Sequence, residues 1–126
     1  MIALDTDVLI EIFDRNSNQG EEALSNLEGH EIGTTSINLH EIGFGLMKAG
    51  QSVPSELTSL RVLDLTEDDA LLSSKMEADL EGQGNSPCRF DAMIASICVN
   101  NGAWLYTLNL AHFRRFHDHG LRVFRP

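Results

Sequence analysis

Short apolar runs alternate with helix-type patterns along the whole chain. Strand-like runs occupy residues 2–4, 31–34, 61–65, 103–106 and 121–124. Between them, helix-type patterns occupy residues 8–13, 21–27, 36–47, 66–80, 86–100 and 109–116, and Pro54 begins a further brief helical segment. Strands that are separated by helical crossovers run parallel and are covered by helices on both faces. The alternation therefore predicts an α/β fold with a parallel sheet between two helical layers.

Length and composition limit the chain to one ordinary globular domain. Its 126 residues, 42% of them hydrophobic and 22% charged, suit a single domain over residues 1–126. No apolar run approaches the roughly 20 residues that cross a membrane. Asp5 and Asp7 occupy the region where a signal peptide would be apolar. We expect a cytoplasmic protein with no membrane partner.

The charge balance argues against a broad nucleic-acid-binding surface. The formal net charge is −10, with nineteen acidic and nine basic residues. Four of the basic residues are nevertheless clustered near the C-terminus: Arg114, Arg115, Arg122 and Arg125. This cluster has two interpretations, a solvated final helix with cations at its C-terminal end or a local patch that contacts phosphates.

Three acidic residues lie in apolar surroundings: Asp5, Glu41 and Asp91. A carboxylate at the border of a hydrophobic segment is costly to desolvate unless a metal ion, a cation or a hydrogen-bond donor compensates it. Asp5 and Asn109 also follow predicted strands directly, and ligands of parallel sheets bind beyond the carboxyl ends of the strands. We expect the fold to gather the three carboxylates into one pocket that holds a divalent metal.

Each of these residues also has a simpler interpretation. Asp5 and Asn109 are both typical helix N-caps, and Asn109 could alternatively hold a metal-bound water. Glu41 could be a solvent-facing helix residue, and Asp91 could lie on a solvated helix face. Asp91 is expected in the second turn of its helix, where its small neighbours favour a ligand position over a solvated face. Asp7 is expected to have a structural or supporting role.

Two glycines follow Glu41 in the same predicted helix. Gly43 and Gly45 weaken a helix by roughly 1 kcal/mol each relative to alanine. Such glycines permit close packing against a neighbouring element or a second chain.

Side chains that accept hydrogen bonds predict where several helices begin. Ser36 is a candidate cap, Thr66 forms a weak capping box with Asp69, and Ser86 precedes Pro87 at a predicted N-terminus.

The two cysteines are ten residues apart and fit no metal-binding spacing. We expect Cys88 and Cys98 to be small buried hydrophobes in a reducing compartment.

Four segments together resemble the motifs of PIN-domain nucleases. They are DTDVLI at 5–10, SINLHEI at 36–42, DAMIA at 91–95 and TLNLAHF at 107–113. The ending, GLRV at 120–123 followed by Pro126, is similar to that of the VapC toxins within the family. The resemblance covers essentially the whole chain, and its specificity comes from four motifs in order.

The resemblance implies a metal-dependent endoribonuclease, the toxin of a toxin–antitoxin pair. The implied fold is a three-layer sandwich with a five-stranded parallel sheet, commonly homodimeric. Asp5, Glu41 and Asp91 would hold Mg²⁺ or Mn²⁺, and Asn109 would take a fourth catalytic position at which many relatives have Asp. RNA is the implied substrate and a small antitoxin protein the implied partner.

Two other functions remain open on the sequence. One is a PIN-like domain that binds RNA or protein without cutting, which Asn109 and the acidic composition allow. The other is a haloacid-dehalogenase-like phosphatase, since Asp5-Thr6-Asp7-Val8 matches its opening motif. That enzyme needs a lysine near the phosphate, and only Lys48 and Lys75 are available.

Overall fold

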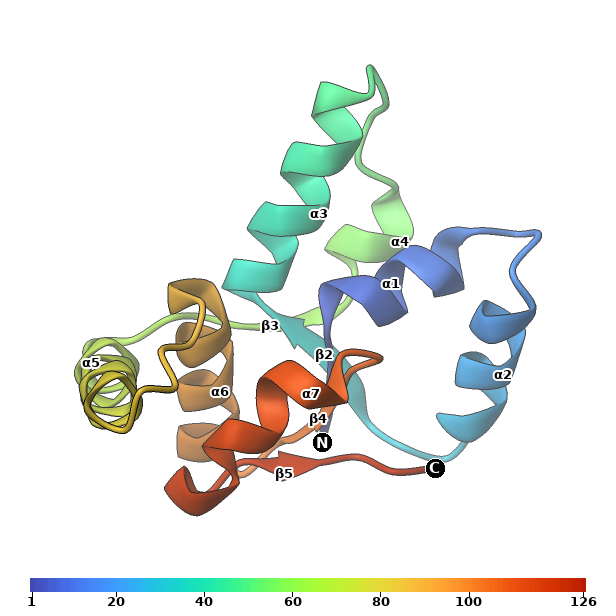
Figure 1. Cartoon of the computed structure of the whole chain (residues 1–126). Coiled ribbons are helices and arrows are strands. Elements are labelled where there is room, and N and C mark those ends of the chain that lie inside the picture. Colours follow the sequence, from blue (N-terminus) through green and yellow to red (C-terminus); the bar gives the residue numbers. More distant parts are fainter.

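The computed structural model describes residues 1–126 and contains a five-stranded parallel sheet flanked by helices (Figure 1). The strands are β1 (Ile2–Leu4), β2 (Ile32–Thr35), β3 (Arg61–Leu63), β4 (Trp104–Tyr106) and β5 (Arg122–Val123). The helices are α1 (Thr6–Phe13), α2 (Asn18–Asn26), α3 (Ser36–Lys48), α4 (Ser55–Thr58), α5 (Glu67–Gly82), α6 (Arg89–Asn101) and α7 (Leu110–Phe113), followed by the 3₁₀ helix η1 (Arg114–His119).

The strand order is β3-β2-β1-β4-β5, and every neighbouring pair is parallel. The predicted three-layer α/β fold is confirmed. With β1 at the centre, its carboxyl end lies beside those of β2 and β4. The residues that follow these three strands are therefore brought to one edge of the sheet.

Side chains that alternate along the strands separate the core into two parts. Ala3 and Leu105 face a cluster that includes α5, α6 and η1, whereas Ile2, Leu4 and Tyr106 face a second cluster with α1 and α2. Figure 1 shows α5 and α6 on one side of the sheet and α1 and α2 on the other.

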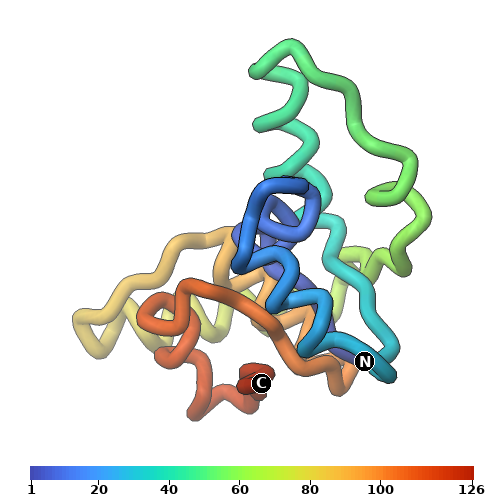
Figure 2. The backbone as a smooth tube through the Cα atoms, turned by 90° about the vertical axis from the view of Figure 1, so that its right-hand side faces the viewer, coloured from blue at the N-terminus to red at the C-terminus, as the bar shows by residue number.

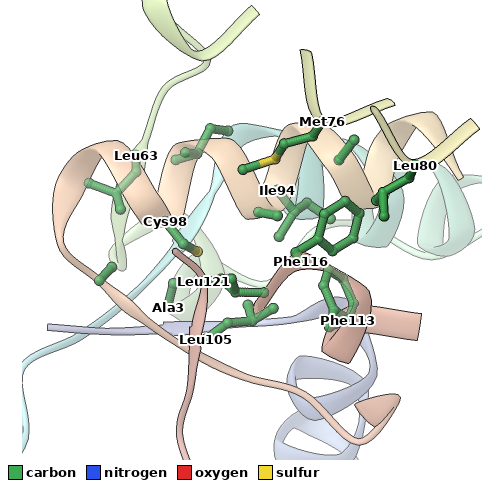
Figure 3. Packing of buried hydrophobic residues seen from close by; sticks show 14 residues of the cluster. Ala3, Leu63, Met76, Leu80, Ile94, Cys98, Leu105, Phe113, Phe116 and Leu121 are labelled. Atoms are coloured by element: carbon green, nitrogen blue, oxygen red, sulfur yellow. The ribbon is translucent and has the colours of Figure 1, made fainter. Parts of the chain in front are cut away.

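The first cluster fixes the C-terminal segment against the sheet. Phe113 and Phe116 are buried between α6 and the strands, with their ring centroids 6.1 Å apart (Figure 3). Leu121 completes the contact just before β5. Burial of such side chains stabilises by about 1.5–3 kcal/mol each, so the segment after β4 is held firmly despite its short elements.

Of the three predicted helix starts, one is confirmed and two are shifted. Thr66 and Asp69 form the predicted capping box. Thr35 rather than Ser36 caps α3, because the Ser36 hydroxyl accepts the amide of Leu65 instead. The prediction for Ser86 is also wrong, since the extended backbone of Cys88 delays the start of α6 to Arg89.

The prediction for the cysteines is half right. Cys98 is buried, and burial raises the pKa of its thiol to about 12. Cys88 is exposed, because it lies before the first turn of α6 and not on its apolar face. Both thiols are free. No helix combines the length and apolar character that crossing a membrane requires.

Candidate active site

Asp5 is buried at the carboxyl end of β1 with only 7% of its surface exposed. It occupies the N-cap position of α1, yet its side chain makes no capping hydrogen bond. Its Oδ1 accepts the amide of Asn38 at 2.8 Å, and its Oδ2 accepts the hydroxyl of Thr107 at 2.7 Å. The interpretation of Asp5 as a simple side-chain cap is therefore wrong. Neutral donors, not a basic residue, hold its carboxylate.

Asn38 is the central residue that the sequence did not single out. It is fully buried on α3, and its amide nitrogen donates to Asp5 and, at 3.0 Å, to the hydroxyl of Thr6. Its amide oxygen accepts the Thr35 hydroxyl at 2.7 Å. A recognisable signal existed, because Asn38 and Glu41 are three residues apart and share one helix face. The amide thus links the carboxyl ends of β1 and β2.

Glu41 lies on α3, half-buried and directed toward this network. Its Oε1 accepts the hydroxyl of Thr6 at 3.0 Å. Burial raises the pKa of Glu41, with further contributions from the negative charges of Asp5 and Asp91 and opposition from the Thr6 hydrogen bond. The alternative of a freely solvated helix glutamate does not fit this environment.

No close contact within the chain requires the two glycines beside Glu41. A Cβ added at Gly43 or Gly45 would meet no atom within 4 Å. The expectation of close packing against a neighbouring element of the same chain is therefore wrong.

Asp91 lies at the start of α6. It is the third residue of the helix and so lies in its first turn, not the second as predicted. Burial raises its pKa, and repulsion from Asp5 adds to this, while His112 and Arg115 oppose it. The Nδ1 of His112 lies 3.6 Å from Asp91 Oδ2. The fold thus brings Asp5, Glu41 and Asp91 close enough to influence one another electrostatically.

Asp7 has the structural role expected of it. Its carboxylate accepts the backbone amide of Leu108 at 3.2 Å and the Thr107 hydroxyl at 3.4 Å, which fixes the turn after β4. Burial, followed by the charge of Asp5, raises the pKa of Asp7 to about 6. This turn also supplies the hydroxyl that Asp5 accepts.

Asn109 begins α7 but does not cap it through its side chain. Its Nδ2 lies 2.9 Å from Nδ1 of His112, the imidazole nitrogen that also approaches Asp91. The predicted N-cap position of Asn109 is confirmed, but its side chain makes no capping hydrogen bond, so capping does not explain the amide. The structure places this amide next to the acidic residues through His112.

The acidic residues fit a hard divalent cation chemically but do not form a closed cage. No group of three acidic, histidine or cysteine side chains lies close enough to hold a metal ion by itself. Mg²⁺ needs only one or two carboxylates because it keeps several of its waters, and carboxylates suit Mg²⁺ and Mn²⁺. Burial, together with the charge of Asp5, raises the pKa values of Glu41 and Asp91, so a bound cation would offset the cost of keeping both carboxylates charged. The donor set therefore fits an open, water-rich site.

The C-terminal arginines do not form the single patch that the sequence suggested. Arg115 donates to the carbonyl of Ser86 and lies on the side of Asp91. Arg114, Arg122 and Arg125 instead line a separate cavity of about 1250 Å³. Neither Asp5, Glu41 nor Asp91 lines that cavity.

Comparisons with known proteins agree with this architecture. A family model described as PIN domain matches residues 2–117. No curated protein matches the sequence.

Solved structures show the same fold at low sequence identity. DNA-bound VapBC from Salmonella typhimurium is similar at 25% identity over 98% of this chain and 96% of that one, with a TM-score of 0.79. VapBC2 from Rickettsia felis bound to a promoter DNA fragment is 24% identical over 98% of both chains, with a TM-score of 0.78. A toxin–antitoxin complex from Klebsiella pneumoniae is 21% identical over 90% of both chains, with a TM-score of 0.72.

Proposed function

The chain belongs to the PIN-domain family, and from this premise we propose that it is a metal-dependent endoribonuclease that hydrolyses phosphodiester bonds in RNA. One observation carries the proposal. Asp5, Glu41 and Asp91 come from three separate segments, and their carboxylates influence one another at the carboxyl edge of the sheet. A fold gains nothing in stability by gathering partly buried like charges, so a bound cation is the physical reason to keep them together.

Asp5, Glu41 and Asp91 would hold Mg²⁺ or Mn²⁺. When bound, such an ion lowers the pKa of a water and stabilises negative charge that develops on phosphate oxygens. The neighbouring residues keep the carboxylates in position. Asn38 and Thr107 fix both oxygens of Asp5. Partners of this kind typically change metal affinity or activity by roughly 10–100-fold when they are removed.

We assign Asn109 to the fourth catalytic position as a hydrogen-bonding residue and not as a charged ligand. Its amide both donates and accepts, so it can orient a water or a phosphate oxygen without adding to the repulsion at Asp91. The proposal keeps residues 1–126 as one functional domain.

The family and the fold likeness support a toxin role. The Klebsiella pneumoniae structure is of a toxin–antitoxin complex, and we propose that this protein likewise binds a small antitoxin. A site that acts on cellular RNA would operate in the cytoplasm.

Helix α3 offers a surface for such assembly, either with the antitoxin or with a second copy in a homodimer. Figures 1 and 2 show α3 and the segment toward α4 extending away from the sheet. Phe44 and Met47 on α3 are 62% and 66% exposed, and the nearby Gly43 and Gly45 carry no side chains. Exposed aromatic and methionine side chains are characteristic of interface cores.

A binding module without catalysis is the second candidate, since the acidic residues form no closed metal cage. The phosphatase alternative is not supported. Lys75 forms an ion pair with Asp79 on α5, and Lys48 ends α3, which begins near Asp5. Neither lysine reaches Asp5 to hold a phosphate.

Cleavage of RNA by the purified chain tests the proposal. Wild type should cut RNA in Mg²⁺ or Mn²⁺ and stop in EDTA, and Asp91→Asn should cut at least about 100-fold more slowly. Asp118→Asn, which removes an exposed carboxylate on η1, is the matched control and should behave as wild type. RNA binding without cleavage in either metal would reject the nuclease in favour of the binding module.

A further inference from the structure

A groove lies at the opposite end of the sheet from the acidic residues. Its volume is about 1250 Å³, and it is lined by the starts of β4 and β5, by α7 and η1, and by the turn before β2. Both termini of the chain lie at this end (Figures 1 and 2). Asp5 follows the last residue of β1, and Ile2 at the start of β1 lines the groove. At about 3.3 Å per residue, roughly 10 Å separates the groove from the acidic site.

The groove is basic on a protein that is otherwise strongly acidic. Arg114, Arg122 and Arg125 line it, and all three are exposed. Glu31 is its single acidic lining residue and already forms an ion pair with Arg61. Three of the nine basic residues of the chain thus face one cavity with almost no opposing charge. A polyanion is the ligand that complements this arrangement.

Aromatic rings stand beside these arginines. Trp104 is 40% exposed. The Arg122 guanidinium lies over its ring, 4.7 Å from the ring centroid. The carbonyl of Gly102 accepts a hydrogen bond from Arg122 at 2.9 Å, which fixes the guanidinium plane. Phe124 is held by edge contacts with His30 and Tyr106, at 5.4 and 5.2 Å between ring centroids. The rings are therefore held in place before any ligand arrives.

We propose that this groove binds a single-stranded segment of the RNA substrate, outside the scissile phosphate. Single-stranded nucleic acid is bound by basic grooves whose aromatic rings and arginine planes stack on the bases. Stacking of one base on an aromatic ring contributes about 1–3 kcal/mol without regard to sequence. The inference rests on the proposed ribonuclease function and adds to it a second RNA contact. This contact would hold the strand while the acidic end of the sheet, with Asp5, Glu41 and Asp91, cleaves it.

An acidic peptide is the competing ligand for such a groove. It would match the arginines but would leave Trp104 and Phe124 without a specific role. Nucleic acid uses both the charges and the rings, so the composition of the groove favours it.

Trp104 is the single tryptophan of the chain and lines the groove, so its fluorescence reports occupancy directly. The experiment titrates a short oligouridylate into Asp91→Asn protein in EDTA, which prevents cleavage. The expected result is saturable quenching of Trp104 emission with the same midpoint as fluorescence anisotropy of the labelled RNA. Binding by anisotropy without quenching would place the RNA elsewhere and overturn the proposal.

Charge reversal in the groove supplies the second measurement. Arg114→Glu with Arg125→Glu should weaken binding by at least about 10-fold and lower the salt dependence by about 1.4, or 0.7 per phosphate contact on a single strand. Arg15→Glu with Lys75→Glu makes the same charge change away from the groove and should have a much smaller effect. If both double variants lose RNA affinity equally, the loss follows from net charge alone, and the groove is rejected as the RNA-binding site. Equally strong quenching by an oligoglutamate peptide would reject nucleic acid as its ligand.

The outcome is separable from that of the nuclease proposal. If RNA quenches Trp104 but the wild type cuts no RNA in Mg²⁺ or Mn²⁺, the groove stands and the catalytic proposal fails. If the wild type cuts RNA and Trp104 does not respond, the nuclease stands and the groove proposal fails.

Discussion

The two ends of the central strands differ in the sign and in the burial of the charges that they carry. At the carboxyl end, Asp5 is buried and bonded by the neutral groups of Asn38 and Thr107. At the amino end, Trp104 and Arg122 are exposed and form a stacked pair. One end concentrates negative charge in a low-dielectric setting, and the other presents positive charge to solvent. The net charge of −10 therefore describes neither end, and it is a poor guide to which ligands the protein takes.

The largest expected effect separates catalysis from strand binding. Asp5→Asn should reduce RNA cleavage by at least about 100-fold, because it removes a proposed metal ligand and not merely a supporting residue. The same variant should bind oligouridylate in EDTA at least as tightly as wild type, since one repelling charge is gone. Cleavage rates and Trp104 quenching, measured on the same preparation, check both statements. A parallel loss of cleavage and binding in Asp5→Asn would mean that the two ends are not independent.

The next prediction compares how much each end of the sheet contributes to the free energy of unfolding. Asn38→Leu should lower the free energy of unfolding by about 2–3 kcal/mol, because it leaves a buried oxygen of Asp5 without its donor. Arg122→Ala should cost only about 0.5–1 kcal/mol, the contribution of an exposed cation–π contact. Urea unfolding of both variants in EDTA makes the comparison. Equal losses would contradict the assignment of Asn38 as the buried support of the acidic site.

The acidic end should also give the protein an unusual pH dependence. The pKa of Asp7 is raised from 3.8 to about 6, so the folded state takes up its proton before the unfolded state does. This group therefore adds stability that is fully present below about pH 4 and is lost as the pH rises through about 6. Asp7→Asn should accordingly melt at a higher temperature than wild type at pH 8, and the difference should vanish near pH 4.

Thermal unfolding in EDTA from pH 4 to 8 tests this sign. Asp118→Asn serves as the control, because it removes an exposed carboxylate on η1, away from Asp5 and Asp7. The prediction fails if wild type and Asp7→Asn lose stability in parallel as the pH rises.

The sequence predicted the fold well because each strand and helix is encoded by nearby residues. The run Ile2–Leu4 ends directly at Asp5, so strand and candidate site could be placed together. The spacing to Glu41 placed Asn38 on the same helix face, but its contact with Asp5 was not predictable, because it depends on β1 and β2 being neighbours and joins residues more than thirty positions apart.

The C-terminal arginines show the same limit. Arg114 and Arg115 are adjacent in sequence, yet one lines the groove and the other bonds to the carbonyl of Ser86. The sequence shows that the arginines are clustered near the C-terminus. Which of them share a surface depends on how η1 packs in the folded chain. Cys88 was misjudged for a related reason, since helical periodicity does not tell where the first turn begins.

The smallest expected effect concerns the amide at the fourth position of the acidic end. Asn109→Asp adds a carboxylate beside His112 and near Asp91, where the PIN-domain resemblance leads one to expect an acid. An added ligand charge should tighten Mn²⁺ binding by about 3–10-fold, equivalent to roughly 0.6–1.4 kcal/mol.

Calorimetric titration of Mn²⁺ into wild type, Asn109→Asp and Asn18→Asp measures this gain. Asn18→Asp adds the same charge at the exposed start of α2, where solvent and salt screen it over about 10 Å. If both variants tighten Mn²⁺ binding equally, net charge explains the effect and Asn109 is not part of the metal environment. If Asn109→Asp alone gains, the amide is what leaves the natural site open and rich in water. The acidic end would then differ from the groove in one further respect, since its affinity would be limited by a single neutral side chain and not by the number of charges around it.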